Sequence, residues 1–298
     1  MATGKIPFIN FGGERMITVA IPMGSQPDIL TLVTRARSEL ASTLADKLQF
    51  VVFDSGSNVD QADTWTFHQA RDEADAVTQA VGLVAQGKAD ILLKGIVQTH
   101  TLLKELLRPD YQLRLQKVLS HVAIIHLPQL NRPLLLSDAG MNIDPDEDRL
   151  AAIVENAVGV AHQIGLPKPK VALLSAAENF NPKMPSSVLA QAVAKQFETR
   201  SDAVIAGPIS LDLALSPASV AHKHYEGVIQ GDADVLIVPT IDVGNVLYKA
   251  LMLFTDARSG GTIVGAKVPI VLTSRSDSVD SKLTALAFAI AQLKGGAS

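Results

Sequence analysis

The sequence contains no cysteine, few aromatic residues and no long apolar run. Without cysteine, the chain cannot form disulfides, a thiolate zinc site or a thioester on an enzyme thiol. Aromatic residues make up only 4%, so platforms for stacking nucleic-acid bases are not expected. Charged residues make up 19% and the net charge is -4, which differs from the basic surface typical of nucleic-acid-binding proteins. No apolar run approaches the roughly 18–20 residues of a transmembrane helix, and the start MATGKIPFINFGGERM does not read as a signal peptide. We therefore expect a cytoplasmic protein that binds neither nucleic acid nor membrane.

Small aliphatic residues are abundant and occur in short runs. The chain has 298 residues, 47% of them hydrophobic, which suffices for one large domain or two ordinary ones. Segments with helical spacing, such as Glu73–Ala85 and Leu150–Ile164, separate these runs. Apolar strands that alternate with helices are typical of a parallel sheet covered on both faces, so we predict an α/β fold. The expected strands are residues 16–21, 50–53, 89–93, 122–127, 133–137, 170–175, 202–207, 233–238 and 269–273.

The last predicted element is a helix near the C-terminus. Its apolar residues recur at helical spacing: Leu283, Leu286, Ile290 and Leu293. Asp277 or Ser278 is expected to cap this helix, and Asp280 lies in its first turn. The helix is expected to end before Gly295.

Two stretches of the sequence are alike. QGKADILLKGI (86–96) and QGDADVLIVPTI (230–241) both begin Gln-Gly-x-Ala-Asp-x-Leu. We expect each to leave a helix at the glycine, form a strand and open into a polar loop. Any two helix–strand units could look like this. Alternatively, the chain contains two similarly built halves, whose loops would line one cleft because ligands bind beyond the carboxyl ends of parallel strands.

Polar residues follow several predicted strands and are candidates for binding an anion. Glycine allows close backbone approach, helix starts favour anions, and arginine offers a rigid fork of donors. An ordinary turn is the alternative in each case: Arg275 could simply pair with Asp277, and Lys249 could be a solvated side chain. The candidates are Lys94, Gly95, Thr99, Glu178, Gly244, Asn245, Lys249, Ser274 and Arg275.

Other signals are weaker, and we expect no metal site. A dinucleotide-binding glycine fingerprint and a phosphate-binding P-loop are both absent. His222 and His224 alternate, so on a helix they would point apart. Four aspartates lack the glycine spacing of a calcium loop and are interpreted as a solvated turn. They are Asp138, Asp144, Asp146 and Asp148.

Taken together, these segments resemble the phosphate acetyl/butyryl transferase family, specifically its phosphate butyryltransferase branch. The matching stretches run in order from about residue 75: KADILLKG, LSHVAI, SDAGMNIDP, NAVGVAHQIGLPKPKVALLSAAE, NPKMPSS, GPISLD, GDADVLIVPTIDVGNVLYK and VGAKVPIVLTSRSDS. The resemblance implies interconversion of a short-chain acyl-CoA plus phosphate with an acyl phosphate plus CoA. It further implies CoA as a substrate, no permanently bound cofactor, and a homo-oligomer, either a dimer or larger.

The resemblance also implies an architecture. We expect two three-layer α/β domains with mostly parallel sheets and an active-site cleft between them. The first domain would comprise residues 1–143 and 278–298, because the C-terminal helix returns to it. Residues 144–277 would form the inserted second domain.

Specific residues match the motifs of the family. Ser274 and Arg275 match its Ser-Arg pair at the reactive phosphate, and its Gly-Asn-x-x-x-Lys motif corresponds to Gly244, Asn245 and Lys249. The acetyl branch has glycine after the Ser-Arg pair, whereas this chain has Ser276, which favours butyryl or branched acyl groups. At the position of that branch's base carboxylate stands Ser281, so Asp277 or Asp280 would have to substitute, and we take Asp277 as catalytic.

The sequence fits two other functions less well. A nicotinamide-dependent dehydrogenase of the isocitrate-dehydrogenase-like group would need clustered aspartates for a metal and an arginine-rich carboxylate site, and the sequence shows neither. A non-catalytic CoA- or anion-binding module would explain a cleft. It gives no reason for a carboxylate beside the Ser-Arg pair.

Overall fold

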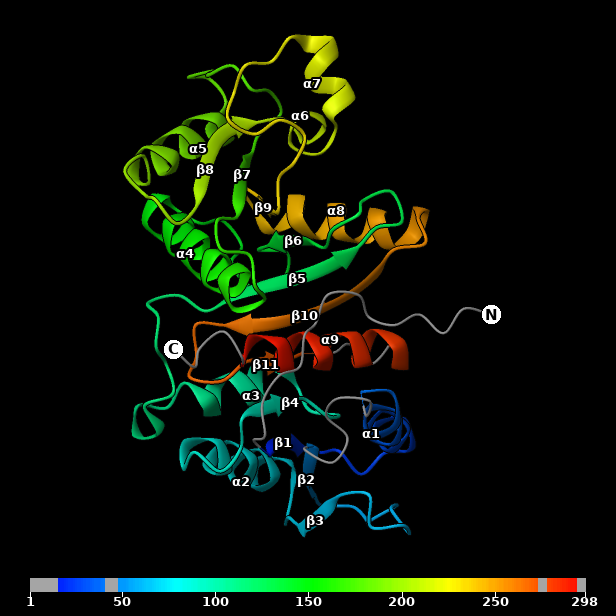
Figure 1. Cartoon of the computed structure of the whole chain (residues 1–298). Coiled ribbons are helices and arrows are strands. Elements are labelled where there is room, and N and C mark those ends of the chain that lie inside the picture. Colours follow the sequence, from blue (N-terminus) through cyan, green and yellow to red (C-terminus); the bar gives the residue numbers. More distant parts are fainter. Residues whose placement is uncertain (1–15, 41–47, 273–277, 294–298) are drawn as a thin grey trace. The chain divides into compact units, whose positions relative to one another are not determined.

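The computed structural model describes residues 16–40, 48–272 and 278–293 (Figure 1). The chain divides into two compact units, Met1–Leu115 with Gly260–Ser298, and Gln116–Ser259. The divisions therefore lie earlier than the expected boundaries at 143/144 and 277/278. The first boundary is earlier because strand β6 (Leu134–Ser137) pairs with β5 (Ser120–His126) and with β9 (Val235–Ile237) of the second unit. The second is earlier because β11 (Ile270–Val271) pairs with β4 (Ile91–Leu93) of the first unit.

The first unit has three layers. Its strands lie in the order β3-β2-β1-β4-β11-β10, and all their described pairings are parallel except β10 with β11. Helices α1 and α9 pack together and share one core with β1 and β2, whereas α2 packs against the strands from the other side (Figure 1). The bounds are β1 Ile17–Pro22, α1 Pro27–Glu39, β2 Leu48–Asp54, β3 Thr66–Gln69, α2 Glu73–Ala85, β4 Ile91–Leu93, α3 Thr99–Leu106, a 3-10 turn Pro109–Tyr111, β10 Arg258–Val264, β11 Ile270–Val271 and α9 Val279–Gln292.

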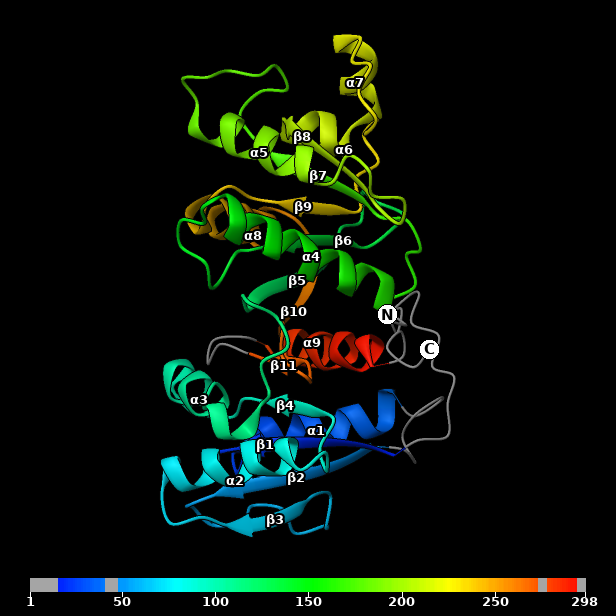
Figure 2. The same ribbon diagram turned by 90° about the vertical axis from the view of Figure 1, so that its left-hand side faces the viewer.

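The second unit is also three-layered. Its strands lie in the order β5-β6-β9-β7-β8, antiparallel between β5 and β6 and parallel elsewhere. Helices α4 and α5 pack together on one face (foreground of Figure 2). Apolar residues of α6, α7 and α8 form the core on the other face. The remaining bounds are α4 Glu147–Gln163, β7 Lys170–Leu174, α5 Pro185–Gln196, β8 Val204–Ile209, α6 Leu211–Leu215, α7 Pro217–Lys223 and α8 Ile241–Phe254.

The predicted α/β class with mostly parallel sheets is confirmed, with local exceptions. The segment predicted as helix from 73 to 85 is α2, with the same bounds. Strands β5 and β6 are antiparallel because residues 127–133 are too few for a crossover, which needs about a dozen residues or more. Strands β3 and β10 were not predicted, because TFHQ is short and polar and RSGGTIV contains two glycines.

The two similar stretches form the same turn in both units. Gly87 and Gly231 have φ values of +69° and +77°, the left-handed region that glycine tolerates best. The carboxylate of Asp90 accepts from the backbone N of Thr18 at 2.9 Å, and Asp90 N donates to Thr18 O at 2.8 Å. Asp234 does the same with Lys170, at 2.8 Å in both directions. Each aspartate thereby sets the register between the strand that follows it and the neighbouring strand. The similarity of the two stretches therefore reflects a shared structural role. The second copy does not leave a helix, because α7 ends at Lys223.

No helix in the described part of the chain is long and apolar enough to cross a membrane.

Candidate functional site

In the first unit, the loop after β4 passes close to the end of β1. Gly95 N donates to Pro22 O at 3.2 Å, and Ile96 N donates to Met23 O at 2.8 Å. A Cβ on Gly95 would collide with the carbonyl oxygens of Pro22 and Met23. Only glycine fits this approach, so Gly95 fixes the path of the loop.

The two polar candidates beside Gly95 differ in exposure. The side chain of Lys94 is buried, with the residue 6% exposed, and its ammonium donates to Gly95 O at 3.2 Å and Val97 O at 3.3 Å. Lys94 therefore braces the loop. Thr99 is exposed and is the first residue of α3, where backbone N–H groups have no partner within the helix.

The predicted catalytic residues Ser274, Arg275 and Asp277 lie outside the described residues. The helix that follows them is described. Ser278 caps α9, since its Oγ accepts from Ser281 N at 3.2 Å, as expected. Asp280 forms an ion pair with Arg35 at 2.6 Å, so its carboxylate is already bound by a cation on α1.

In the second unit, the start of α8 lies against the loop that follows β6. A Cβ on Gly244 would lie 2.8 Å from Asp138 O and 2.9 Å from Ala139 Cα, so glycine permits this contact. The Asn245 amide donates to Ala139 O at 3.4 Å. Lys249 is exposed and lies one turn after Asn245, on the same side of the helix.

Glu178 follows β7 and lies at the carboxyl edge of the same sheet. Ser210, directly after β8, donates to Glu178 at 3.4 Å and to Asp212 at 2.7 Å. Lys223 pairs with Asp212 at 3.0 Å. The hydrogen bond from Ser210, followed by that from Lys223, lowers the pKa of Asp212. Sequence reasoning missed Ser210, Asp212 and Lys223, although the position of GPISLD at a strand end was a usable signal.

One prediction about the acidic stretch after β6 is wrong. Asp138 is only 2% exposed, so it does not belong to a solvated turn. The other aspartates of that stretch, Asp144, Asp146 and Asp148, are exposed. Asp146 caps α4 by accepting from Arg149 N at 2.9 Å. Among the residues that the structure describes, no group of three or more acidic, histidine or cysteine side chains is arranged to hold a metal.

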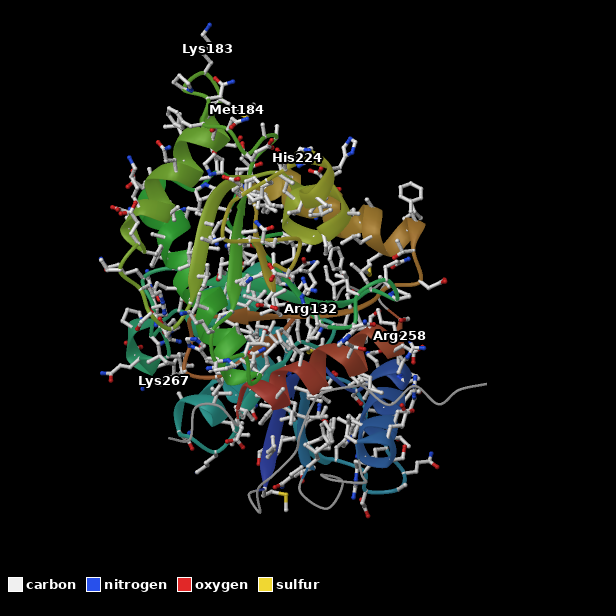
Figure 3. The ribbon with its side chains drawn as sticks, turned by 45° about the horizontal axis from the view of Figure 1, so that its top comes forward. Arg132, Lys183, Met184, His224, Arg258 and Lys267 are labelled. Carbon is white, nitrogen blue, oxygen red and sulfur yellow. The ribbon has the colours of Figure 1, made fainter. Side chains whose placement is uncertain are left out.

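Burial favours the neutral form of two histidines of β5. The Nδ1 of His121 and the Nε2 of His126 are buried and have no hydrogen-bond partner among the described residues. Burial lowers the pKa of His121, and the Asp138 charge opposes this effect. Burial also lowers the pKa of His126, and the positive charge of Arg258 (Figure 3) adds to the effect.

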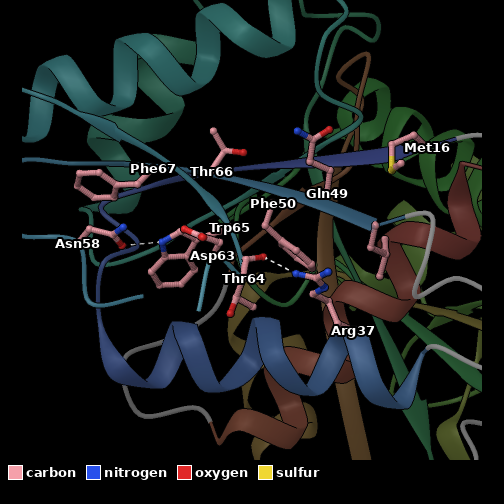
Figure 4. Close-up of a pocket in the computed structure, with 11 residues that line it drawn as sticks. Met16, Arg37, Gln49, Phe50, Asn58, Asp63, Thr64, Trp65, Thr66 and Phe67 are labelled. Atoms are coloured by element: carbon pink, nitrogen blue, oxygen red, sulfur yellow. Dashed lines mark hydrogen bonds between the residues drawn. The ribbon is translucent and has the colours of Figure 1, made fainter. Parts of the chain in front are cut away.

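A pocket of about 820 Å³ lies in the first unit (Figure 4). It is formed at the amino ends of β1, β2 and β3. Trp65 Nε1 donates to Asn58 at 2.9 Å, and Arg37 donates to Thr64 O at 2.9 Å. None of the predicted site residues that the structure describes lines it, and it lies at the opposite end of the strands from Lys94 and Gly95. The carboxyl edges of the two sheets are therefore the better candidates.

Comparison with known proteins decides the family. A family model described as "Phosphate acetyl/butaryl transferase" matches residues 34–290. The chain belongs to the phosphate acetyl/butyryl transferase family. The match confirms the resemblance and extends it toward the N-terminus, because the motifs that carry the resemblance begin only at about residue 75.

The named relatives include phosphate butyryltransferases and phosphate acetyltransferases. The chain is 42% identical over 216 residues to the phosphate butyryltransferase of Clostridium acetobutylicum, covering 72% of each protein. It is 36% identical over 276 residues to that of Clostridium beijerinckii, covering 91% of each. A solved structure of a branched-chain phosphotransacylase from Enterococcus faecalis V583 is 56% identical, with a TM-score of 0.89, covering 93% of this chain and 99% of that one.

Proposed function

We propose that this protein transfers a short acyl group, butyryl or branched, between CoA and phosphate. It thereby interconverts acyl-CoA plus phosphate with acyl phosphate plus CoA. The observation that carries the proposal is the 56% identity, over nearly the whole of both chains, to a branched-chain phosphotransacylase. Of the predicted site residues that the structure describes, Gly95 follows β4, Glu178 follows β7, and Gly244 and Asn245 lie in the first turns of α8.

The reaction needs positioning and charge stabilisation more than a special reagent. The CoA thiolate attacks the carbonyl carbon of the acyl phosphate, a C–S bond forms, and the C–O bond to phosphate breaks with its electron pair leaving on phosphate. A thiol pKa of roughly 8.5 means that a modest base or a nearby cation can supply thiolate near neutral pH. Holding the two reactants in line and stabilising the developing negative charge account for the rest of the rate.

The proposal gives each predicted site residue a role in this reaction. Ser274 and Arg275 bind the phosphoryl group, and Asp277 accepts the thiol proton. Asn245 donates to the carbonyl oxygen, and the exposed Lys249 adds positive charge beside it. Of the other predicted site residues, Thr99 and Glu178 are proposed to contact substrate, whereas Lys94, Gly95 and Gly244 are proposed to hold the backbone that carries the site. CoA is a substrate in this scheme, and no resident cofactor takes part. The enzyme is proposed to be a homo-oligomer, and light scattering would measure its mass.

One assay separates the competing functions. Purified protein is mixed with butyryl-CoA, and free thiol is followed with and without phosphate. Thiol release that requires phosphate, and that arsenate restores in its place, supports acyl transfer. Equal release without either anion would indicate a thioesterase, and no release would leave only a binding module. A dehydrogenase is not favoured, because the family and its named relatives are acyltransferases.

A further inference from the structure

Asp138 is a buried carboxylate whose two oxygens are fully occupied by the protein. Its Oδ1 accepts from the backbone N of Gly140 at 2.8 Å and of Met141 at 2.9 Å. Its Oδ2 accepts from His121 N at 3.1 Å and from the amide of Asn142 at 2.6 Å. Burying a carboxylate is unfavourable unless donors surround it. Four donors satisfy it here, three of them from its own loop, so the carboxylate organises residues 138–142.

The loop organised by Asp138 supports the first turns of α8. Ile143 O accepts from Ile241 N at 2.9 Å, and Gly244 permits contact with the backbone of Asp138 and Ala139. Ala139 O accepts from the Asn245 amide at 3.4 Å. Because a carbonyl oxygen can only accept, this bond determines that the NH₂ end of the Asn245 amide faces the loop. The orientation of an exposed amide therefore depends on a carboxylate that it does not touch.

We propose that Asp138 is a positioning residue for acyl transfer. It holds the Ala139 carbonyl, which accepts one N–H of the Asn245 amide, so that the second N–H of the same NH₂ group is aimed at the substrate carbonyl. This inference rests on the proposed function, in which Asn245 stabilises negative charge developing on that oxygen. A donor of this kind loses its value when it is displaced, because stabilisation depends on orientation fixed before the reaction. Asp138 thus acts on the reaction through Asn245 and without contact to substrate.

A double-mutant cycle tests this dependence. Removing one preorganised donor costs roughly 100-fold or more in kcat, so Asn245→Ala should lose about that factor. Asp138→Asn keeps the size of the side chain but places an NH₂ group among donors, and it should lower kcat by roughly 10- to 100-fold with KM little changed. In the Asn245→Ala background, the same Asp138→Asn change should cost less than about threefold in kcat, because coupled residues are not additive.

Two further variants keep the test decisive. Asp234→Asn is the control for Asp138→Asn. It also removes a carboxylate that accepts from a backbone N–H, that of Lys170, but it does so at the amino edge of the same sheet, so kcat should stay near normal. Gly244→Ala pushes α8 and the loop apart without changing the carboxylate. It should lower kcat in the otherwise natural protein and add little to Asn245→Ala. If Asp138→Asn fails to fold, the Gly244 cycle alone decides.

All variants are compared at equal folded concentration, in the butyryl-CoA and phosphate assay. Losses from Asp138→Asn or Gly244→Ala that are equal with and without Asn245 would overturn the positioning role, as would a folded Asp138→Asn protein with normal kcat. A natural protein that releases no phosphate-dependent thiol would overturn the proposed function itself. The two failures are therefore told apart by the activity of the unsubstituted enzyme.

Discussion

Leu286→Ala is expected to destabilise the first unit, although position 286 is far along the chain from most of that unit. Leu286 lies on α9, is 0% exposed, and belongs to the same core cluster as Ile21, Ile29 and Trp65. Truncating a fully buried leucine to alanine removes transfer free energy and leaves a cavity, at a cost of about 2.7–5 kcal/mol. The free energy of unfolding of the unit should fall by an amount in that range.

The single tryptophan of the chain provides the readout. Trp65 is the only Trp and is 6% exposed within this core, so its emission reports on the first unit. With a urea m value of roughly 2 kcal/mol/M, a loss of about 3 kcal/mol lowers the unfolding midpoint by about 1.5 M. Leu253→Ala is the matched control. Leu253 is 76% exposed on α8 of the second unit, and its truncation should change stability by less than about 0.5 kcal/mol.

The reasoning is refuted if Leu286→Ala leaves the Trp65 transition unchanged. That result would mean that α9 contributes nothing to the core around Trp65. A similar shift caused by Leu253→Ala would also contradict it, since the exposed leucine has no buried contacts to lose.

Four other outcomes are expected. Burial lowers the pKa of His126, so below about pH 6.5 the unfolded chain binds more protons than the native protein, and the free energy of unfolding falls as pH decreases. Urea unfolding near pH 7.5 and pH 5.5 measures this fall. It should be smaller for His126→Asn than for the unsubstituted protein. Gly95→Ala should lower kcat/KM at least about tenfold by displacing its loop, whereas Gly82→Ala on α2, where a Cβ meets nothing within 4 Å, should keep activity and gain about 0.5–1 kcal/mol of stability. Butyryl-CoA should give a higher kcat/KM than acetyl-CoA, by a graded margin because one methylene is worth only about 1–3 kcal/mol; the reverse order would contradict the assignment to the butyryl branch. Asp277→Asn should lower kcat more than Asp280→Asn, because the Asp280 carboxylate is bound in an ion pair; kinetics of the two folded variants, with their melting temperatures, decide it.

The sequence predicted the fold well where periodicity and turn chemistry agreed. Helix α2 was predicted to the residue because its apolar residues recur at helical spacing and a glycine follows its end; in the structure, Asp72 caps its start and Gly87 is left-handed. The likeness of 86–96 to 230–241 was informative because both Asp90 and Asp234 bind the first residues of a neighbouring strand. Such a signal is local, so a single sequence can reveal it.

The failures concern tertiary surroundings. Asp138 was read as solvated because four aspartates in one short stretch usually lie at a surface. Its burial depends on hydrogen-bond donors from His121 and from the loop itself. No sequence pattern in the stretch predicts these donors. Gly244 and Asn245 were predicted as polar residues that follow a strand, but their contact with Ala139 could not be predicted, because β6 and α8 are brought together only by the sheet. The order of the strands likewise depends on pairing that periodicity does not encode.

The return of α9 to the first unit has a consequence for how the protein is made. A ribosome completes residues 116–259, the whole second unit, before it reaches β11 and α9, which the first unit needs. Strand β11 pairs with β4, and α9 supplies core residues against α1. At ~5–20 residues per second, the strands β1 to β4 would wait on the order of ten seconds or more with these apolar faces uncovered. We therefore expect the second unit to fold before the first, although its residues are translated later than 16–115. Stalled chains ending shortly after residue 259 would then resist proteolysis in 116–259 and be cut in 16–115. Protection of the N-terminal segment in such chains would show that it folds without its C-terminal part. If the second unit does fold first, chaperones that bind exposed apolar surface should matter more during synthesis of this protein than after it has folded.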